Sequence, residues 1–117
     1  MKENKGYVKK YYNNDDLMFE GEYLYGERNG KGKEYYYNGK LKFEGEYLNG
    51  KRNGKGKEYD YDILLFEGEY LNGKRNGYGK EFYLNGLLKF EGEFLNGKKW
   101  NGNGYGYEYK NKKIFLI

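Results

Sequence analysis

Apolar and polar residues alternate in four short stretches of the chain, each built around the sequence FEGEY or FEGEF. In the second stretch, an extended chain would place Leu41, Phe43, Gly45 and Tyr47 on one side and the residues between them on the other. The matching stretches span residues 17–23, 64–70 and 88–94. A period of two residues predicts a β-strand with one apolar face at each of these positions.

Turn-forming residues separate these stretches, because Asn-Gly occurs ten times along the chain. Asn and Gly tolerate the positive φ angles that tight hairpin turns require. Helices are disfavoured, since no window shows an apolar stripe with a period of 3.6 residues and Gly interrupts the chain too often. We therefore expect an all-β fold, an elongated single-layer antiparallel meander of stacked β-hairpins.

The four motifs begin at Phe19, Phe43, Phe66 and Phe90, so one unit of some two dozen residues is repeated. Repeats of this length form arrays in which each unit packs on its neighbours. We expect a single domain over residues 1–117. Its predicted parts are an N-terminal partial repeat (1–16), four repeats (17–40, 41–63, 64–87 and 88–111) and a C-terminal partial strand (112–117).

The pairing of neighbouring strands is open between two registers. A two-residue turn at Asn49 would place Phe43 opposite Gly56 and favour ion pairs between the strands. An odd-length connection would place Phe43 beside Tyr35 and gather the aromatic rings on one face. Burying an aromatic ring stabilises a fold by about 1.5 to 3 kcal/mol, more than the 0 to 1 kcal/mol of an exposed ion pair. We therefore expect the second, aromatic register.

The composition excludes most catalytic chemistry. No Ser, Thr, Cys or His is present, so the chain has no hydroxyl or thiol nucleophile of the usual kind and no imidazole or thiolate metal ligand. We therefore predict a protein that is not an enzyme and that has no metal site and no cofactor. The formal net charge of +4 is too small to indicate a polyanionic partner by itself.

The sequence contains no evident signal for secretion or for membrane insertion. Its first residues are charged, unlike a signal peptide, and no stretch approaches the roughly 20 apolar residues of a membrane-spanning helix. The absence of Cys favours an intracellular location, because small secreted domains often depend on disulfides. We expect a cytoplasmic protein and leave association with membranes or the cytoskeleton open.

The unit FEGEYLNGKRNGKGKEY resembles the MORN motif, in which an aromatic-Glu-Gly-Glu-aromatic run is followed by Asn-Gly and a Gly-x-Gly pair. The Gly-x-Gly pairs begin at Gly30, Gly54, Gly77 and Gly104, and repeat 4 carries about three extra residues around Trp100. The resemblance, which covers nearly the whole chain, implies a scaffold that joins proteins to one another, to cytoskeleton or to membranes. Similar repeats in bacterial toxin–antitoxin systems leave an antitoxin-like immunity role open.

The apolar face of the expected sheet carries two aromatic residues per repeat. These residues are Phe19, Tyr23, Phe43, Tyr47, Phe66, Tyr70, Phe90 and Phe94. A single-layer sheet has no second layer to cover this face, so we expect an aromatic groove that binds an amphipathic helix or a peptide of a protein partner. The alternative is that the sheet coils until the rings cover one another.

The hairpin connections carry basic residues along one edge of the array. These residues are Arg28, Lys51, Arg52, Lys74, Arg75, Lys98 and Lys99. Neighbouring connections would lie about 10 Å apart, close to the Debye length at ordinary salt, and would act as one stripe. The stripe predicts peripheral binding to anionic phospholipid membrane as an alternative function. Basic turns that only keep the array soluble are the simpler explanation.

The C-terminal part of the chain has two features with competing explanations. Trp100, the only Trp, is a candidate contact for a partner, or it fills the gap that the local insertion opens. The last strand is unusually apolar and would leave an open edge, which invites pairing. This strand predicts an end-to-end homodimer, unless it only folds over the last hairpin. Its apolar residues are Ile114, Phe115, Leu116 and Ile117.

Nucleic-acid binding is opposed by the acidic residues. Basic and aromatic residues do alternate at Lys55, Lys57 and Tyr59, as on surfaces that bind single strands. However, every FEGEY or FEGEF motif adds two glutamates, which would repel phosphates. The predicted function is therefore a non-enzymatic scaffold for protein–protein interaction.

Overall fold

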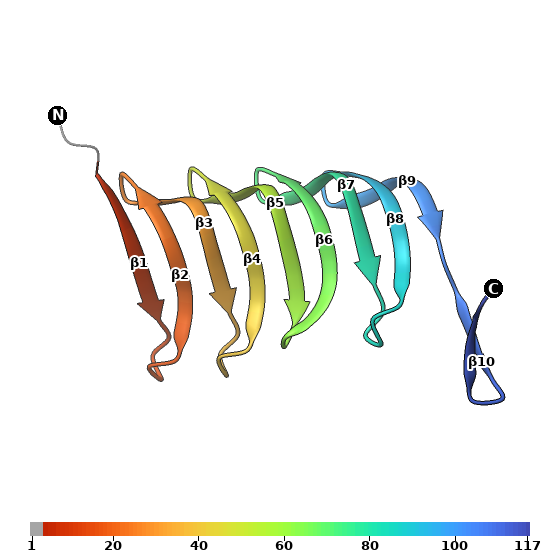
Figure 1. Cartoon of the computed structure of the whole chain (residues 1–117). Helices are drawn as coiled ribbons and strands as arrows, with labels where there is room; N and C mark the ends of the chain where they lie inside the picture. Colours follow the sequence, from red (N-terminus) through yellow and green to blue (C-terminus); the bar gives the residue numbers. More distant parts are fainter. Residues whose placement is uncertain (1–3) are drawn as a thin grey trace.

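The computed structural model describes residues 4–117, which form eleven strands and no helix. Nine strands form one antiparallel sheet in chain order, and the last two form a separate two-stranded sheet. The main sheet contains β1 (Lys5–Tyr11), β2 (Leu17–Leu24), β3 (Glu27–Tyr35), β4 (Leu41–Leu48), β5 (Lys51–Asp60), β6 (Ile63–Leu71), β7 (Lys74–Phe82), β8 (Leu88–Leu95) and β9 (Lys98–Gly104). The second sheet contains β10 (Tyr107–Lys110) and β11 (Lys113–Leu116). The predicted all-β antiparallel meander is confirmed (Figure 1).

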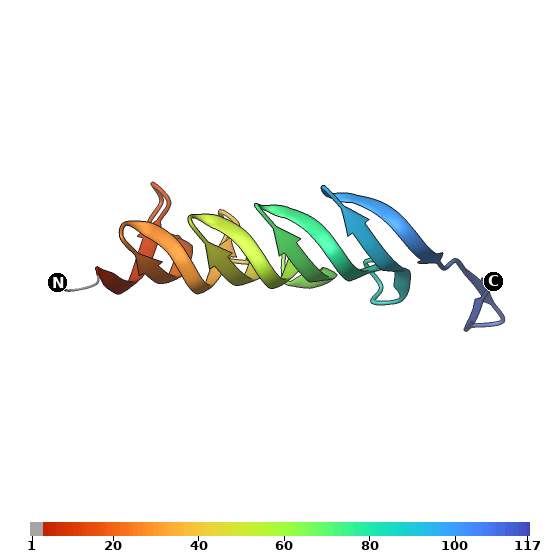
Figure 2. The same ribbon diagram turned by 90° about the horizontal axis from the view of Figure 1, so that it is seen from above.

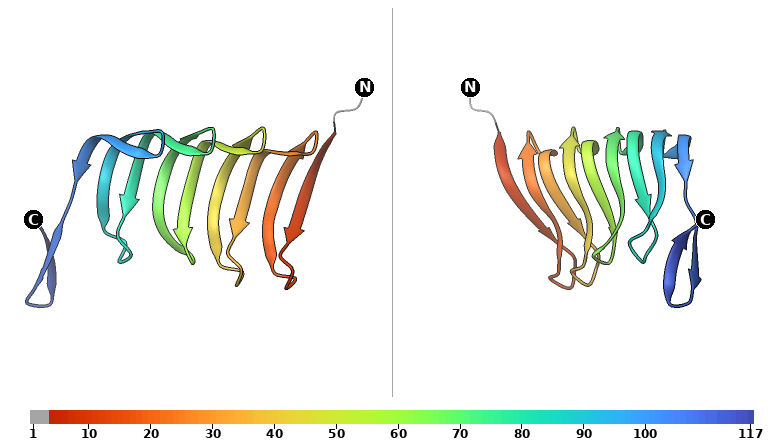
Figure 3. Two further views of the ribbon diagram at one scale, coloured as in Figure 1. Left: turned by 180° about the vertical axis from the view of Figure 1, so that it is seen from behind. Right: turned by 45° about the vertical axis from the view of Figure 1, so that its right-hand side comes forward.

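The molecule is an elongated ribbon that measures 63 × 33 × 16 Å. Its hairpins follow one another along the long axis, and Figure 2 shows each of them curled when the ribbon is seen from above. The N-terminal strand β1 and the β10–β11 hairpin lie at opposite ends of the array (Figure 3). Each strand inside the main sheet therefore pairs only with the strands before and after it in the sequence.

Glycine pairs allow the aromatic rings to rest on the backbone of the sheet. Phe43 and Tyr47 are buried, as the period-two alternation predicts. Gly45 lies opposite Gly56, and a Cβ atom on Gly56 would come within 2.5 Å of the Phe43 ring. Only glycine leaves room for the ring at this position, so the repeated glycines are part of the core.

Both predicted registers are wrong. Phe43 lies opposite Glu34 on β3 and opposite Glu58 on β5, and not beside Tyr35 or Gly56. The aromatic rings still gather on one face, because the strands keep the predicted alternation. The rings therefore pack along that face of the sheet without being direct cross-strand partners of one another.

A β-bulge accounts for the register. The turn at Asn49 has two residues, but the pairing between β4 and β5 then shifts before it reaches Gly45. Gly54 adopts a positive φ of 99° in the bulge, and the backbone N–H of Lys55 donates a 2.6 Å hydrogen bond to the carboxylate of Glu46. The same shift occurs between β2 and β3 and between β6 and β7.

The first strand departs from the glycine pattern of the other repeats. Val8 on β1 lies opposite Gly21, at the position that Gly32 occupies on β3. A Cβ atom on Gly32 would come within 2.7 Å of the Phe19 ring. Val8 therefore stands where the other repeats have the glycine on which a ring rests, and the function of β1 as a cap stays a prediction.

The last strand folds back on the segment just before it, in a separate sheet, and not over the last hairpin of the main sheet. β11 pairs with β10 in the small sheet. The four apolar residues remain between 47% and 76% exposed, and they are Ile114, Phe115, Leu116 and Ile117. The end-to-end homodimer through these residues stays a prediction.

Candidate interaction surfaces

Seven of the eight predicted partner-binding rings form the core of the ribbon. These rings are 0% to 7% exposed, and Tyr23 packs against them while only partly buried. Neighbouring rings meet edge to face, with centroids 5.2 Å apart for Phe43 and Tyr70 and 5.1 Å apart for Phe66 and Phe94. The expected open aromatic groove is therefore wrong, and the alternative, in which the curled sheet lets the rings cover one another, is confirmed.

Arginine side chains cover the rings from the side opposite the glycines. The guanidinium of Arg52 lies 4.0 Å from the centroid of the Phe43 ring. It donates two hydrogen bonds to Glu34, at 3.0 and 3.1 Å, and the hydroxyl of Tyr47 donates to the same carboxylate at 2.6 Å. The Phe43 ring is thus enclosed between glycine backbone and a guanidinium that an acidic residue holds in place.

The same contacts divide the predicted basic edge into two groups. The members that lie over phenylalanine rings, at 4.0 to 5.2 Å from the centroids, are Arg28, Arg52, Arg75 and Lys99. The members that remain exposed at the hairpin tips are Lys51, Lys74 and Lys98. The basic stripe therefore has fewer exposed charges than predicted, because the three arginines contact the core.

The partly buried ion pairs keep their acidic residues charged. Burial alone would raise the pKa of Glu34, but the hydrogen bonds and charge of Arg52 and the hydroxyl of Tyr47 lower its pKa below the ordinary value of 4.5. Burial would likewise raise the pKa of Glu58, but the hydrogen bonds from Arg75 and Tyr70 outweigh it and lower the pKa. Both carboxylates therefore favour the folded state as long as they stay ionised.

Acidification is expected to destabilise the ribbon through these carboxylates. Because their folded-state pKa lies below 4.5, their contribution is complete above about pH 4.5 and is lost as the pH falls through the lower folded-state pKa. Urea midpoints measured from pH 7 to pH 2 should fall below pH 4.5. The double variant Glu58→Gln with Arg75→Gln should give a flatter profile, and an equally steep one would contradict the assignment.

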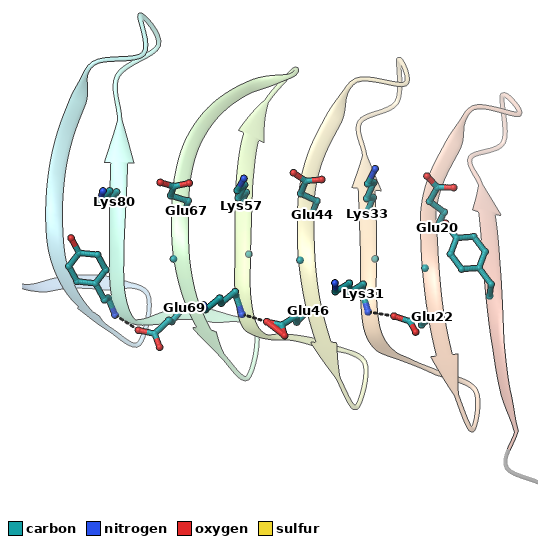
Figure 4. Close-up of a pocket in the computed structure, with 18 residues that line it drawn as sticks. Glu20, Glu22, Lys31, Lys33, Glu44, Glu46, Lys57, Glu67, Glu69 and Lys80 are labelled. Carbon is teal, nitrogen blue, oxygen red and sulfur yellow. Dashed lines mark hydrogen bonds between the residues drawn. The ribbon is translucent and has the colours of Figure 1, made fainter.

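A groove lies on the face of the sheet opposite the rings. It has a volume of about 1160 Å³ and crosses the strands from β1 to β7 (Figure 4). The backbone of the glycine pairs forms its floor, and two rows of side chains form its walls. One row consists of Glu20, Lys33, Glu44, Lys57, Glu67 and Lys80. The other consists of Glu22, Lys31, Glu46, Lys55, Glu69 and Tyr78.

The charges alternate along each wall because every first strand supplies Glu and every second strand supplies Lys, except that β7 supplies Tyr78 to the second wall. Glu44, for example, lies opposite Lys33 on one side and opposite Lys57 on the other. Within residues 4–117, no groove lysine comes within 4.0 Å of a carboxylate. The ammonium groups of the groove therefore keep their hydrogen-bonding capacity for a ligand.

The glutamates of the groove are held in place by the fold. The carboxylate of Glu46 accepts the backbone N–H of Lys55, and the hydroxyl of Tyr59 donates to Glu44 at 2.6 Å. Burial and the hydrogen bond to Glu44 raise the pKa of Tyr59, which keeps its hydroxyl protonated. The groove thus combines fixed acceptors with lysine donors that no ion pair holds.

Trp100 does not fill a gap in the ribbon. It is 68% exposed on β9. There Phe94 lies opposite Lys99 and Glu93 lies opposite Asn101, so the bulge takes up the single residue Trp100. The strand therefore accommodates this region with a smaller bulge than in the other repeats, and a contact with a partner remains the prediction for this side chain.

Replacing Trp100 with alanine is expected to change the free energy of unfolding by no more than about 0.5 kcal/mol, because an exposed side chain makes little packing. Urea unfolding followed by circular dichroism would measure the change. Phe90→Ala is the control on the neighbouring strand, since Phe90 is only 7% exposed and should cost several times more. A loss above 1 kcal/mol for the Trp100 variant would show that the indole supports the fold.

Two other kinds of site are absent from the described residues. Residues 4–117 contain no cluster of three or more acidic, His or Cys side chains that is able to hold a metal ion. In the same range no helix has the length and apolar character needed to cross a membrane. The groove and the exposed hairpin tips are therefore the surfaces to consider.

Sequence comparison agrees with the repeat architecture. The profile of the MORN repeat matches residues 19–40, 43–62, 66–87 and 90–111. The chain belongs to the MORN repeat family. No curated protein matched it in a sequence search. MORN repeats generally take part in interactions with proteins or membranes and are generally not enzymatic, which agrees with the two kinds of surface found here.

Proposed function

We propose that this MORN repeat protein is a non-enzymatic scaffold that binds a segment of a partner protein in its groove. The groove itself carries the proposal, because a cavity of about 1160 Å³ with fixed carboxylates and unpaired ammonium groups is suited to a polar polypeptide. We still expect the ligand to be a helix or a peptide of a partner protein, as the sequence predicts. The proposed binding surface is now the charged face of the sheet, because the rings of the aromatic face are covered.

Site-specific cross-linking would test this assignment. A photoreactive amino acid at Lys57 lies in the groove, and the same amino acid at Lys51 lies at a hairpin tip. Cross-links identified by mass spectrometry should concentrate on the groove position. The captured protein is then purified and titrated directly against the variants below.

Two charge-reversal variants separate the surfaces. Lys33→Glu with Lys57→Glu reverses two groove charges, and Lys51→Glu with Lys74→Glu makes the same change in net charge at the tips. We expect the groove variant to weaken binding of the purified partner at least tenfold and the tip variant to leave it within twofold. Equal effects of the two variants would refute a groove-specific site.

The hairpin tips support a second candidate, binding to anionic phospholipid membrane. Leu48, Leu71 and Leu95 are 48% to 50% exposed and lie opposite Lys51, Lys74 and Lys98. A row of apolar side chains beside ammonium groups suits the interface of an anionic membrane. The arginines of the predicted lipid site do not contribute, because they cover the core. Antitoxin-like immunity and a cytoplasmic location stay predictions.

Vesicle co-sedimentation would test the second candidate. The protein should pellet with vesicles that contain phosphatidylserine and should stay in solution with pure phosphatidylcholine. The tip variant Lys51→Glu with Lys74→Glu should lose this binding, and the groove variant should keep it. Binding that does not depend on anionic lipid would rule the membrane candidate out.

A further inference from the structure

The spacing of charges along the groove matches an extended chain with three residues per repeat. One repeat spans two strand spacings, or about 9.6 Å, so each wall presents one Glu and one Lys over this distance, apart from Tyr78 in the second wall. A polyproline II chain advances about 9.3 Å in three residues. Seven residues of α-helix advance about 10.5 Å and drift out of step with the walls by nearly 3 Å over three repeats.

The length of the groove sets the length of the guest. The groove crosses six strand spacings, which gives about 29 Å. The groove accordingly holds about nine extended residues.

The chemistry of the walls agrees with this geometry. A polyproline II chain forms no internal hydrogen bonds, so its N–H and C=O groups need outside partners. The groove presents carboxylates for the first and ammonium groups for the second at every repeat. We propose that the groove binds an extended, polyproline II-like segment of about nine residues that carries Lys and Glu at three-residue intervals. This proposal rests on the proposed function.

Synthetic peptides would test the conformation of the guest. The probes are fluorescent (Pro-Lys-Glu)n peptides with n from 1 to 5, together with an alanine-based helical peptide that has one Lys and one Glu per seven residues. Anisotropy titrations should show affinity rising up to n of 3 and then levelling off. Lys33→Glu with Lys57→Glu should weaken the n = 3 complex at least tenfold, whereas Lys51→Glu with Lys74→Glu should not.

A protein with a longer groove tests whether the length of the groove sets the length of the bound peptide. A variant with residues 41–63 duplicated carries one more repeat. In this variant, the value of n at which the affinity stops rising, here called the levelling point, should increase by one. Tighter binding of the helical peptide, or a levelling point that stays in place, would overturn the proposal. If no peptide binds while the groove variant still loses its purified partner, the extended guest is wrong and the proposed function stands. If that partner binds the groove variant normally, the proposed function itself fails.

A separate observation concerns the C-terminal strand of the main sheet. Residues 103–109 read NGYGYEY and match residues 76–82, which read NGYGKEF. In repeat 3 this segment places Gly79 opposite Gly68. In repeat 4, however, Gly92 lies opposite Gly102, and the matching Gly106 lies four residues further on, outside β9.

Each of the two possible pairings of this strand offers contacts that the other lacks. The observed register gains the ion pair between Lys99 and Glu81, at 3.0 Å, and the contact of Lys99 with the Phe90 ring. A shift of four residues would place Gly106 opposite Gly92 and let Glu93 accept the N–H of Tyr105, as Glu69 accepts that of Tyr78. An even shift keeps every side chain on its own face.

We infer that β9 exchanges between these two registers. In the shifted register residues 107–109 enter the main sheet, so that β11 becomes its edge strand in place of β9. The apolar C-terminal residues then border the array directly. This exchange gives the C-terminal end two alternative surfaces.

Disulfide trapping would detect both registers, because the chain contains no Cys of its own. Directly opposed residues lie within disulfide range. Glu91→Cys with Asn103→Cys reports the observed pairing, and Glu91→Cys with Tyr107→Cys reports the shifted one. In the third repeat, Glu67→Cys with Lys80→Cys and Glu67→Cys with Leu84→Cys serve as the matched pair.

Both pairs in repeat 4 should oxidise in the folded protein, whereas in repeat 3 only the pair in the observed register should do so. Mass spectrometry of the unreduced protein measures the fraction that is cross-linked. If Glu91→Cys with Tyr107→Cys cross-links no more than Glu67→Cys with Leu84→Cys, the exchange is refuted. Circular dichroism of each variant before oxidation confirms that the fold is retained.

Discussion

Replacing Phe66 with alanine is expected to lower the free energy of unfolding by about 3 to 5 kcal/mol, because the ring is fully buried and leaves a cavity. The ring packs edge to face against Tyr70 and Phe94, and the guanidinium of Arg75 covers it at 4.1 Å. The loss is a large share of the 5 to 15 kcal/mol that stabilises a typical domain. Urea unfolding followed by circular dichroism would measure it.

The position of Phe66 in the array adds a second expectation. Repeat arrays owe their cooperativity to contacts between neighbours, so a cavity in the third repeat should separate the unfolding of the two ends and broaden the transition. Phe115→Ala is the control, since Phe115 is 47% exposed in the small sheet and should cost less than about 1 kcal/mol. A similar cost for both variants would contradict the description of Phe66 as core.

The strands and the repeat were predictable from the sequence because they depend on local patterns. The period-two alternation around Phe43 identifies a strand and its buried face without any knowledge of the neighbours. The register was not predictable in this way. It depends on a bulge in which Gly54 takes a positive φ and Glu46 binds a backbone N–H nine residues away, and no alternation of apolar residues records that contact.

The error in register also concealed the groove. Glu44 was expected to face away from the rings, but which lysines would lie beside it depends on the pairing of β4 with β3 and β5. Without that pairing, the charges appear as separate solvated residues. The correct register assembles them into two continuous walls above a glycine floor, and the candidate site is a property of the assembled sheet.

The arginines were misjudged for a different reason. Arg28, Arg52 and Arg75 were grouped with the lysines as surface charge, although Arg recurs at one defined position of the repeat. A planar guanidinium is able to stack on a ring and to bind a carboxylate with two hydrogen bonds at the same time, which an ammonium group cannot do. The regular choice of Arg at this position was therefore the available signal for a structural role.

Replacing Gly68 with alanine is expected to destabilise the ribbon by about 3 kcal/mol or more, at or above the upper end of the range for an overpacked core. The added Cβ atom would lie 2.6 Å from the Cα of Gly79 and from the carbonyl oxygen of Tyr78, and 2.8 Å from the ring of Phe66. Two of these atoms belong to the backbone of a paired strand, so they cannot move aside without breaking the pairing of β6 with β7.

Gly6 provides a control, because it is a glycine with free space around it. A Cβ atom on Gly6 would meet nothing within 4 Å. Gly6→Ala should therefore be neutral or stabilise the protein by up to about 1 kcal/mol, because alanine restricts the unfolded chain. Urea midpoints of the two variants, measured side by side, should fall for Gly68→Ala and should not fall for Gly6→Ala. If Gly68→Ala also proved neutral, the ring of Phe66 would not need the bare backbone of the glycine pair, and the explanation of the repeated glycines would be wrong.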